Sequence, residues 1–461
     1  MKRKTIEKSV STSGIGLHTG EKSVITLRPM PDANKGIVFV KKTPDGDVEI
    51  KADVKNVVTT NRSTTLGKDG HQIKTTEHLL AAAYALGIDD MYIDIEGDEI
   101  PVLDGSAAPF CSLIREAGIM EKEAEKEFFA VDKVLQFNFD ETDSEYIVMP
   151  SEYFEARVLI DFESPYVDKQ FAEILDLRTF CDELAPCRTF GFFSEVEKLL
   201  DQGLIKGGNL DNAVVIADKD ISKEDLDRFA DKLGLDSVNM EEGIISTSPL
   251  KFPNEPARHK LLDFIGDLSL LGMPVNARII AKKPGHKANL AFAKYLKQIA
   301  VKQRKLKGKP KYDPNAEPLL NTVQIMELLP HRFPFLLVDK IIEMGEDYVV
   351  GVKNLTYNEQ LFQGHFPGNP VFPGVLQMEA LAQTGGILAL TLQKNPKGWD
   401  TYFLKMNNVR FKNVAQPGDT LIMKMELVEP IRRGLVHMKG TIYCGDKIIS
   451  EGDLMAQIIK K

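Results

Sequence analysis

Cysteine is scarce in this chain of 461 residues, and the few that occur do not form a framework. The four residues, Cys111, Cys181, Cys187 and Cys444, are scattered, and none belongs to a CxxC pair. Disulfide-stapled secreted domains and thiolate-rich zinc modules need regular cysteine spacing. We therefore exclude a disulfide scaffold and expect reduced thiols in a cytoplasmic protein.

Long apolar runs and an excess of positive charge are also missing. No apolar stretch approaches the roughly 20 residues of a transmembrane helix, so we expect no transmembrane segment. The opening MKRKTIEKSV is basic, but no apolar run follows it, so we expect no secretory signal. A net charge of −9, with 43% apolar and 27% charged residues, is typical of a globular protein and does not favour nucleic-acid binding.

The length suggests about three folding units. Residues 1–125 mix short strand-like runs with a helix that begins at Glu77, and the charged run EKEAEKE, most simply a solvated turn or helix end, marks their boundary. A second α/β unit at 126–303 ends in two helices. Residues 304–318, RKLKGKPKYDPNAEP, have the composition of a linker. Residues 319–461 then indicate a compact α+β unit around one long apolar helix.

A metal site is the first chemistry that the sequence indicates. In RHKLLDFIGD, His259 and Asp263 are four residues apart, so a helix places them on one face. His78 in TTEHLLAAAY can add a third ligand, and three protein ligands with one open position are typical of catalytic zinc. Glu77 is then a candidate general base, because zinc lowers the pKa of its water from about 15.7 towards about 7. Taken alone, a carboxylate in a first helical turn is explained more simply by the helix macrodipole.

A second histidine and carboxylate pair is expected beside this site. Asp267 follows Asp263 by one helical turn, and it can orient His286 in PGHKANL. A carboxylate partner raises the pKa of a histidine and suits it to protonate a leaving amine. Taken alone, His286 is as readily a solvent-facing neighbour of a helix N-cap.

These motifs together resemble a known family. SGIGLHTG, EHLLAA, CRTFGF, RHKLLDFIGDL and GH occur in this order within about residues 1–303, and they are similar to those of the zinc-dependent UDP-3-O-acyl-N-acetylglucosamine deacetylases of lipid A synthesis. The resemblance implies that His78, His259 and Asp263 are the Zn²⁺ ligands and that Glu77 is the base. It implies that His286, paired with Asp267, is the cationic general acid. It also implies that Thr189 and Lys260 polarise the acetamide oxygen and contact substrate, and that Phe190 lies beside the nucleotide end.

The same resemblance implies a fold and a substrate class. We expect two α/β layers that face each other, with the metal at their cleft and an apolar passage for the acyl chain of a UDP-sugar lipid A precursor. The stretch 218–255 is longer than the family pattern, so the loops that flank the site stay open.

The other informative stretch is QGHFPGNPVFPGVLQMEALAQTGG at 363–386. Its prolines and glycines predict a stiff turn directly before a helix. Glu379 lies on that apolar helix, where burial favours a protonated carboxyl. His365 is a candidate base, and the N–H groups near Gly374 and Val375 can hold a carbonyl oxygen that gains charge. The set suits elimination of water next to a thioester, although each residue alone is more simply a loop histidine or a solvent-facing carboxylate.

A second resemblance covers about residues 321–461. IMELLPHRFPFLLVDK, GHFPGNPVFPGVLQMEALAQ, VRFKNVAQPGD and RRGLVHMKG closely resemble the (3R)-hydroxyacyl-[acyl-carrier-protein] dehydratases of the hot-dog fold. It implies that His365 and Glu379 act from different subunits of a homo-oligomer, at least a dimer and by similarity a hexamer. Glutamate rather than aspartate at 379 argues against isomerisation, and the proline-rich loop argues against thioester hydrolysis. Five basic residues can form a positively charged rim that binds the acyl carrier protein, but ordinary solvated strand ends explain them equally well: Arg410, Lys412, Arg432, Arg433 and Lys439.

Together these features predict an α+β protein, with a two-layered α/β deacetylase sandwich of two related subdomains followed by a hot-dog domain. We expect a bifunctional enzyme that deacetylates UDP-3-O-(3-hydroxyacyl)-N-acetylglucosamine with Zn²⁺ and dehydrates (3R)-hydroxyacyl-ACP to trans-2-enoyl-ACP at an independent site. Two alternatives stay open: one half serves only for oligomerisation, or the chain is a binding protein without turnover. The second alternative needs neither Glu77 nor Glu379.

Overall fold

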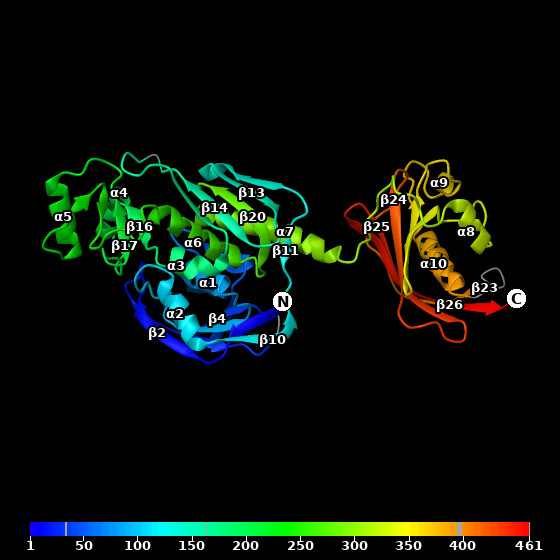
Figure 1. Ribbon diagram of the computed structural model, residues 1–461, viewed down its shortest axis with the longest axis horizontal. Helices are drawn as coiled ribbons and strands as arrows, with labels where there is room; N and C mark the ends of the chain where they lie inside the picture. Colours follow the sequence, from blue (N-terminus) through cyan, green and yellow to red (C-terminus); the bar gives the residue numbers. More distant parts are fainter. Residues whose placement is uncertain (33–34, 163, 394–398, 461) are drawn as a thin grey trace. The chain divides into compact units, whose positions relative to one another are not determined.

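The computed structural model describes residues 1–32, 35–162, 164–393 and 399–460 (Figure 1). The chain divides into two compact units, Met1–Ala300 and Val301–Lys461. Both units combine helices with sheets, which confirms the α+β class. Among the described residues, no helix is long and apolar enough to span a membrane.

A five-stranded sheet forms the base of the first unit. In spatial order its strands are β2 (Val10–Ile15), β3 (Lys22–Pro29), β9 (Met91–Glu96), β4 (Ile37–Thr43) and β5 (Gly46–Lys51). Alternate residues such as Ile25, Leu27, Ile93 and Ile95 are fully buried, as expected for strands with one covered face. A small sheet of β6 (Val57–Thr59), β7 (Thr65–Lys68) and β8 (His71–Ile73) leads into α1 (Glu77–Ala85), and α2 (Ala108–Ala117) packs beside α1.

The run EKEAEKE is a strand, so its interpretation as a solvated turn or helix end is wrong. Its first five residues lie in β10 (Ile119–Glu125), which pairs antiparallel with β1 (Lys2–Ile6). Lys122 is buried, and its ammonium donates to the Asp90 carboxylate at 3.0 Å. Strand alternation leaves most of the other charged side chains in solvent. The sequence does not show the alternation of apolar and polar residues that indicates a strand, because nearly every residue in the run is charged.

A second sheet lies above the helices of the first unit. In order its strands are β12 (Leu135–Phe139), β13 (Ser144–Pro150), β20 (Val275–Lys282), β14 (Glu155–Ile160) and β15 (Gln170–Ile174), with β11 (Phe129–Ala130) also paired to β20. Helices α6 (Glu255–Ser269) and α7 (His286–Lys305) belong to this layer. Figure 1 shows α1 and α6 between the two sheets, and these two helices pack against each other.

A smaller subdomain is inserted before α6. Its sheet has the order β16 (Thr189–Phe192), β17 (Ala213–Ile216), β19 (Ile244–Ile245) and β18 (Met240–Glu241). Two helices accompany it, α4 (Phe193–Asp201) and α5 (Lys223–Leu233), whereas the short α3 (Phe180–Glu183) before them contacts α1. The stretch 218–255 that the sequence left open contributes α5, β18 and β19.

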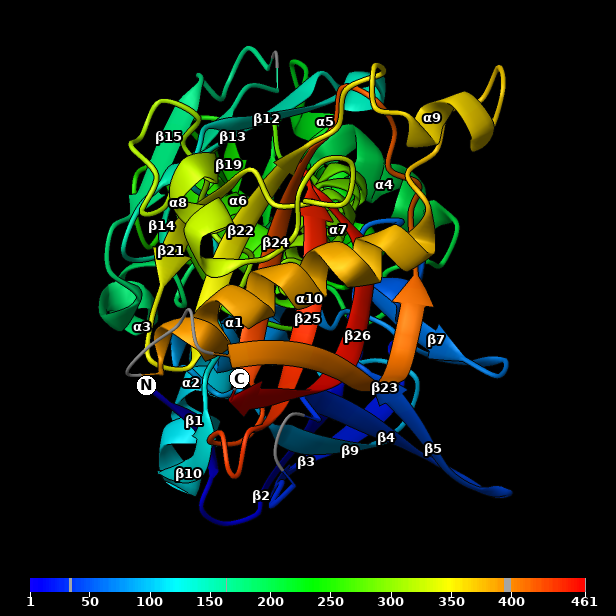
Figure 2. The same ribbon diagram turned by 90° about the vertical axis from the view of Figure 1, so that its right-hand side faces the viewer.

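The second unit is an antiparallel sheet with one long helix across it, as Figure 2 shows. The order is β21 (Lys340–Met344), β22 (Tyr348–Asn354), β24 (Thr420–Leu427), β25 (Leu435–Cys444), β26 (Lys447–Lys460) and β23 (Trp399–Phe411). The helix is α10 (Gly374–Thr391), and α8 (Thr322–Leu328) and α9 (Leu361–Gly364) are short. A sheet around one long helix is the predicted hot-dog arrangement.

Part of the segment with linker composition packs on the face of this sheet that α10 does not cover. Leu306 and Tyr312 contact a small apolar cluster that includes Val350 and Val352. The Lys309 ammonium also donates to the carbonyl oxygen of Gly445 at 2.6 Å. Leu306 and Tyr312 therefore keep this apolar face from water, and the segment around them is more than a solvated connection.

Candidate active sites

His78, His259 and Asp263 converge where the start of α1 meets α6. One ligand atom from each residue lies within 4.8 Å of the others. Asp263 Oδ1 is 3.5 Å from His78 Nε2 and 3.3 Å from His259 Nε2. Gly266 allows the two helices to approach this closely, because a Cβ there would lie 2.2 Å from the carbonyl oxygen of Glu77. The structure thus brings together the three residues that the sequence predicts as ligands.

The chemistry of this cluster fits a divalent cation. The side chains of His78, His259 and Asp263 are buried, and Asp263 Oδ1 has no hydrogen-bond partner. Buried carboxylate oxygens are ordinarily hydrogen-bonded, so this one calls for an explanation. His259 Nδ1 lies 3.1 Å from the carbonyl oxygen of Cys187, which leaves Nε2 directed at the cluster. Two imidazoles and one carboxylate form a donor set of the kind that holds catalytic zinc.

His286 lies against Asp267, as the helical spacing predicts. The distance from His286 Nδ1 to Asp267 Oδ2 is 2.9 Å, and the Asn289 amide donates to the same oxygen at 2.8 Å. The Thr64 hydroxyl donates to the other oxygen of Asp267. Burial alone would lower the pKa of His286, but the Asp267 carboxylate and further acidic neighbours raise it to about 9. The imidazole therefore carries a proton at neutral pH.

Glu77 is the second proton-transfer group of this site. It is 2% exposed, its Oε2 accepts the Thr64 N–H at 3.0 Å, and its Oε1 lies 3.9 Å from His286 Nε2. Burial raises the pKa of Glu77 to about 8, although the facing His286 imidazolium opposes the shift. A carboxyl group that titrates near neutrality can both accept and release a proton.

A cavity of about 290 Å³ adjoins these groups in the first unit. Thr189, Phe190, Lys260 and His286 line it, so three more predicted site residues lie beside the cluster. The Lys260 ammonium is 5.4 Å from the centroid of the Phe190 ring and 3.5 Å from Asp263 Oδ2. The rest of the lining is mainly apolar and includes Leu199, Leu210, Val215, Phe229 and Leu233.

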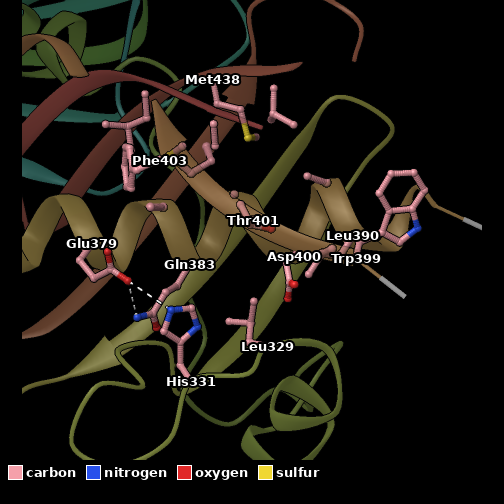
Figure 3. A pocket seen from close by; sticks show the side chains of 18 of the residues that line it. Leu329, His331, Glu379, Gln383, Leu390, Trp399, Asp400, Thr401, Phe403 and Met438 are labelled. Atoms are coloured by element: carbon pink, nitrogen blue, oxygen red, sulfur yellow. Dashed lines mark hydrogen bonds and ion pairs between the residues drawn. The ribbon is translucent and has the colours of Figure 1, made fainter. Parts of the chain in front are cut away.

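Glu379 of α10 faces a separate cavity of about 150 Å³ in the second unit (Figure 3). Its Oε1 accepts the Gln383 amide at 2.9 Å and lies 3.5 Å from His331 Nε2. Apolar side chains such as Leu329, Leu390 and Met438 line the same cavity. The Glu379 side chain is 21% exposed, which is more than an apolar helix suggests, because the carboxylate points to the cavity rather than into the core.

The structure does not bring His365 to Glu379 within one chain. His365 Nδ1 lies 2.9 Å from the carbonyl oxygen of Val371, and its ring stacks on Phe366 with centroids 4.0 Å apart. Among the described contacts of one chain, none joins His365 to Glu379, and His365 does not line the Glu379 cavity. The two predicted partners are therefore separate in the single chain.

The other predicted residues of this site lie at the first turn of α10. Gly374 is its first residue, and Val375 is 75% exposed. A Cβ at Gly374 would lie 2.7 Å from the Phe411 ring, so this position has no room for a side chain.

Several groups around the two sites escaped the sequence analysis. Thr64 contacts Asp267 from a distant part of the chain with no spacing to link them, whereas Asn289 follows His286 by three residues on α7. His331 lies 48 positions before Glu379, in a loop without periodicity. Gln383 could have been predicted from the sequence, because it follows Glu379 by four residues on one helix face.

Comparisons with known proteins cover the whole chain. A family model described as UDP-3-O-acyl N-acetylglycosamine deacetylase matches residues 3–233 and 236–298, and a model described as FabA-like domain matches 329–453. The chain is 46% identical to the bifunctional enzyme LpxC/FabZ of Bacteroides thetaiotaomicron and 43% identical to that of Porphyromonas gingivalis, across 100% of this chain and 99% of each relative.

A single-activity relative matches only the first unit. The UDP-3-O-acyl-N-acetylglucosamine deacetylase of Myxococcus xanthus is 39% identical over 289 residues, which are 62% of this chain and 83% of the relative. Both resemblances inferred from the motifs are confirmed by these matches. The chain therefore belongs to the UDP-3-O-acyl N-acetylglycosamine deacetylase family, as a fusion that also carries a FabA-like domain.

Proposed function

We propose that this chain is a bifunctional enzyme of lipid synthesis. Its first unit deacetylates UDP-3-O-(3-hydroxyacyl)-N-acetylglucosamine with Zn²⁺, and its second unit dehydrates (3R)-hydroxyacyl-ACP to trans-2-enoyl-ACP. The observation that carries the proposal is the buried cluster of His78, His259 and Asp263 beside Glu77 and His286. The name of the single-activity relative supports the UDP-sugar substrate class, and the full-length relatives are named as bifunctional enzymes.

The metal is assigned to the His78, His259 and Asp263 side chains. The unpartnered Asp263 Oδ1 and the two Nε2 atoms around it are the donors that would hold Zn²⁺. A zinc ion bound there supplies Lewis acidity towards the acetamide oxygen and lowers the pKa of nearby water. The positive charge would also favour the carboxylate form of Glu77, which is the form a general base needs.

The remaining deacetylation steps belong to side chains of the first unit. Glu77 takes the proton of the attacking water molecule. Thr189 and Lys260 donate to the acetamide oxygen as it gains negative charge. His286, held by Asp267, gives its proton to the nitrogen that leaves as an amine, because its raised pKa keeps it cationic until that step.

Dehydration is assigned to the proline-rich loop and α10. His365 removes the α-proton of the thioester, and the N–H groups of Gly374 and Val375 hold the carbonyl oxygen. Glu379 gives a proton to the β-hydroxyl group. The α C–H bond and the β C–O bond break, a C=C bond forms, and water leaves.

This second site needs another copy of the chain. β23 is an edge strand, and five of its apolar side chains are 40–56% exposed: Tyr402, Phe403, Leu404, Met406 and Phe411. An open apolar edge strand is a surface for pairing with a second chain. We propose a homodimer through β23 that brings His365 of one copy to Glu379 of the other, within a trimer of dimers.

Acyl carrier protein is the proposed macromolecular partner of this site. Arg432, Arg433 and Lys439 are exposed and suit an acidic surface, whereas Arg410 and Lys412 share the carboxylate of Glu451. The four free cysteines agree with a cytoplasmic location.

The test is to measure both activities and the metal content of one preparation. We expect one Zn²⁺ per chain and both activities. A chelator should abolish deacetylation and leave dehydration unchanged. His365→Ala should do the reverse, and loss of both activities in that variant would contradict independent sites.

A further inference from the structure

The stretch 218–255 forms a defined helix. Ser222 caps α5 through a capping box with Asp225, and the helix ends before Gly234, whose φ of +70° lies in the left-handed region. The apolar residues Leu226, Phe229 and Leu233 repeat at three- and four-residue intervals, so they share one face. α5 is therefore an amphipathic helix built to cover an apolar surface.

That face is fixed against the small subdomain. Phe229 is fully buried, and its ring centroid is 5.0 Å from that of Phe193. The Lys232 ammonium lies 2.7 Å from Asp201 and 3.5 Å from Glu197, both on α4. In Figure 1, β16 and β17 lie between α5 and α6. The packing and the ion pairs hold α5 in one place.

Phe229 and Leu233 also line the cavity that adjoins the metal cluster. Thr189, Lys260 and His286 line one part of the cavity, and their polar side chains suit a reacting amide group. The α5 residues and their apolar neighbours Leu199, Leu210 and Val215 offer no partner for a sugar hydroxyl or a phosphate. This part of the wall suits an alkyl chain that is attached to the reacting sugar.

We propose that α5 closes this cavity and that Phe229 and Leu233 set the longest acyl chain that the deacetylase accepts. The inference rests on the deacetylase function proposed above and adds the residues that determine its chain-length specificity. Each methylene group that fits against the wall strengthens binding by about fourfold. A chain that is longer than the cavity must displace a packed aromatic ring, which close packing resists.

The experiment changes the wall in both directions in the full chain. Phe229→Leu and Leu233→Ala enlarge the cavity, and Leu233→Trp fills it. Leu226→Ala is the matched control, because Leu226 packs on the same apolar cluster from α5 but does not line the cavity. The measurement is kcat/KM for UDP-sugar substrates that differ only in acyl length, together with calorimetric binding of free 3-hydroxy fatty acids of the same lengths.

We expect the enlarging variants to favour longer chains, with the long-to-short ratio rising about fourfold for each added methylene that fits. Leu233→Trp should move the preference to shorter chains. Leu226→Ala should keep the wild-type ratio even if its total rate falls. Phe229 is fully buried, so if its variant does not fold, the two Leu233 variants decide, because Leu233 is only partly buried.

The same length preference in wild type, Leu233→Ala and Leu233→Trp would overturn the assignment of α5. If the wild-type chain deacetylates no UDP-sugar at all, the proposed function fails instead. Binding of the free hydroxy acids still tests α5 in that case, since unchanged length dependence across the variants would overturn it and shifted dependence would support it.

Discussion

The two candidate sites differ in how completely a single chain brings their predicted residues together. In the first unit, His78, His259 and Asp263 share one buried cluster, and His286 already contacts its carboxylate partner. In the second unit, Glu379 lies beside Gln383 and His331, but His365 is elsewhere in the same chain. One chain brings the residues of the first site together, whereas the second site, as proposed, needs two chains.

The exposure of the side chains follows the same division. His78, His259 and Asp263 are 2–5% exposed, while the side chains of Glu379 and His331 are 21% and 30% exposed. Glu379 and His331 are partly exposed in the single chain near the apolar edge strand β23, which is a surface that a second copy of the chain can cover. A variant that disrupts association should therefore lose dehydration and keep deacetylation. A variant of the metal cluster should lose deacetylation and keep dehydration.

The largest separation is expected from His259→Ala. The variant removes one metal ligand, so deacetylation should fall to background and bound zinc should be lost, while dehydration stays at the wild-type rate. Metal analysis and both assays on one sample check this. His71→Ala, which changes a histidine outside the cluster, is the control and should alter neither activity. Zinc retention with full deacetylation in His259→Ala would contradict the ligand assignment.

Glu77→Ala should separate proton transfer from metal binding. Because Glu77 is assigned as the base and not as a ligand, zinc content should be unchanged while kcat for deacetylation falls by about 10²- to 10⁴-fold. Single-turnover kinetics with metal analysis measures both quantities. Near-normal turnover would remove Glu77 from the mechanism.

Met406→Lys tests whether only the second site depends on association. Met406 is 51% exposed on β23, and a buried lysine would oppose pairing of two edge strands. We expect a shift towards monomer in analytical ultracentrifugation and a parallel loss of dehydration, with deacetylation unchanged. Val428→Lys, at an apolar position 55% exposed outside β23, is the control. A monomeric variant that still dehydrates at the wild-type rate would contradict the proposal that the second site depends on association.

Asp90→Asn should change stability in the first unit alone. Burial by itself would raise the pKa of Asp90, but hydrogen bonds from Arg3 and Lys122 outweigh it and hold the pKa below its usual value. A depressed pKa in the folded state stabilises the fold above the unfolded value of about 3.9 and loses this effect as pH falls through the folded value. Breaking a buried ion pair costs about 3–5 kcal/mol.

The readout for Asp90→Asn is denaturant unfolding at several pH values, followed separately for the two units. The difference from wild type should be full at pH 7 and should shrink as pH falls below about 4 towards the lower pKa of the folded wild-type carboxyl group. A difference that is independent of pH, or one that appears in the second unit, would contradict the assignment.

Local spacing carried much of the prediction for the first site. The four-residue steps from His259 to Asp263 and on to Asp267 place all three on one face of α6. The contact of α6 with α1 at Gly266 and the Thr64 hydrogen bond to Asp267 depend on tertiary packing, which no sequence period reports. The metal cluster could therefore be anticipated, but its supporting hydrogen bonds could not.

Prediction was weaker where the pattern was uniform or the partner distant. EKEAEKE hid a strand because charge masked the alternation of its two faces. The amphipathic pattern of α5 was present in the sequence, but nothing showed that it lines the cavity beside α6. The residue types suggested His365 and Glu379 for one elimination, but their placement on different subunits came only from the family resemblance, since one chain keeps them apart.

Complementation between inactive variants tests the central claim most directly. Chains with His365→Ala and chains with Glu379→Gln should each lack dehydration. When they are mixed and allowed to exchange subunits, about one quarter of wild-type dehydration should return, because half of the dimers are mixed and one of their two sites is intact. Deacetylation should stay at the wild-type rate throughout. No recovery after verified exchange would contradict a dehydratase site divided between two copies.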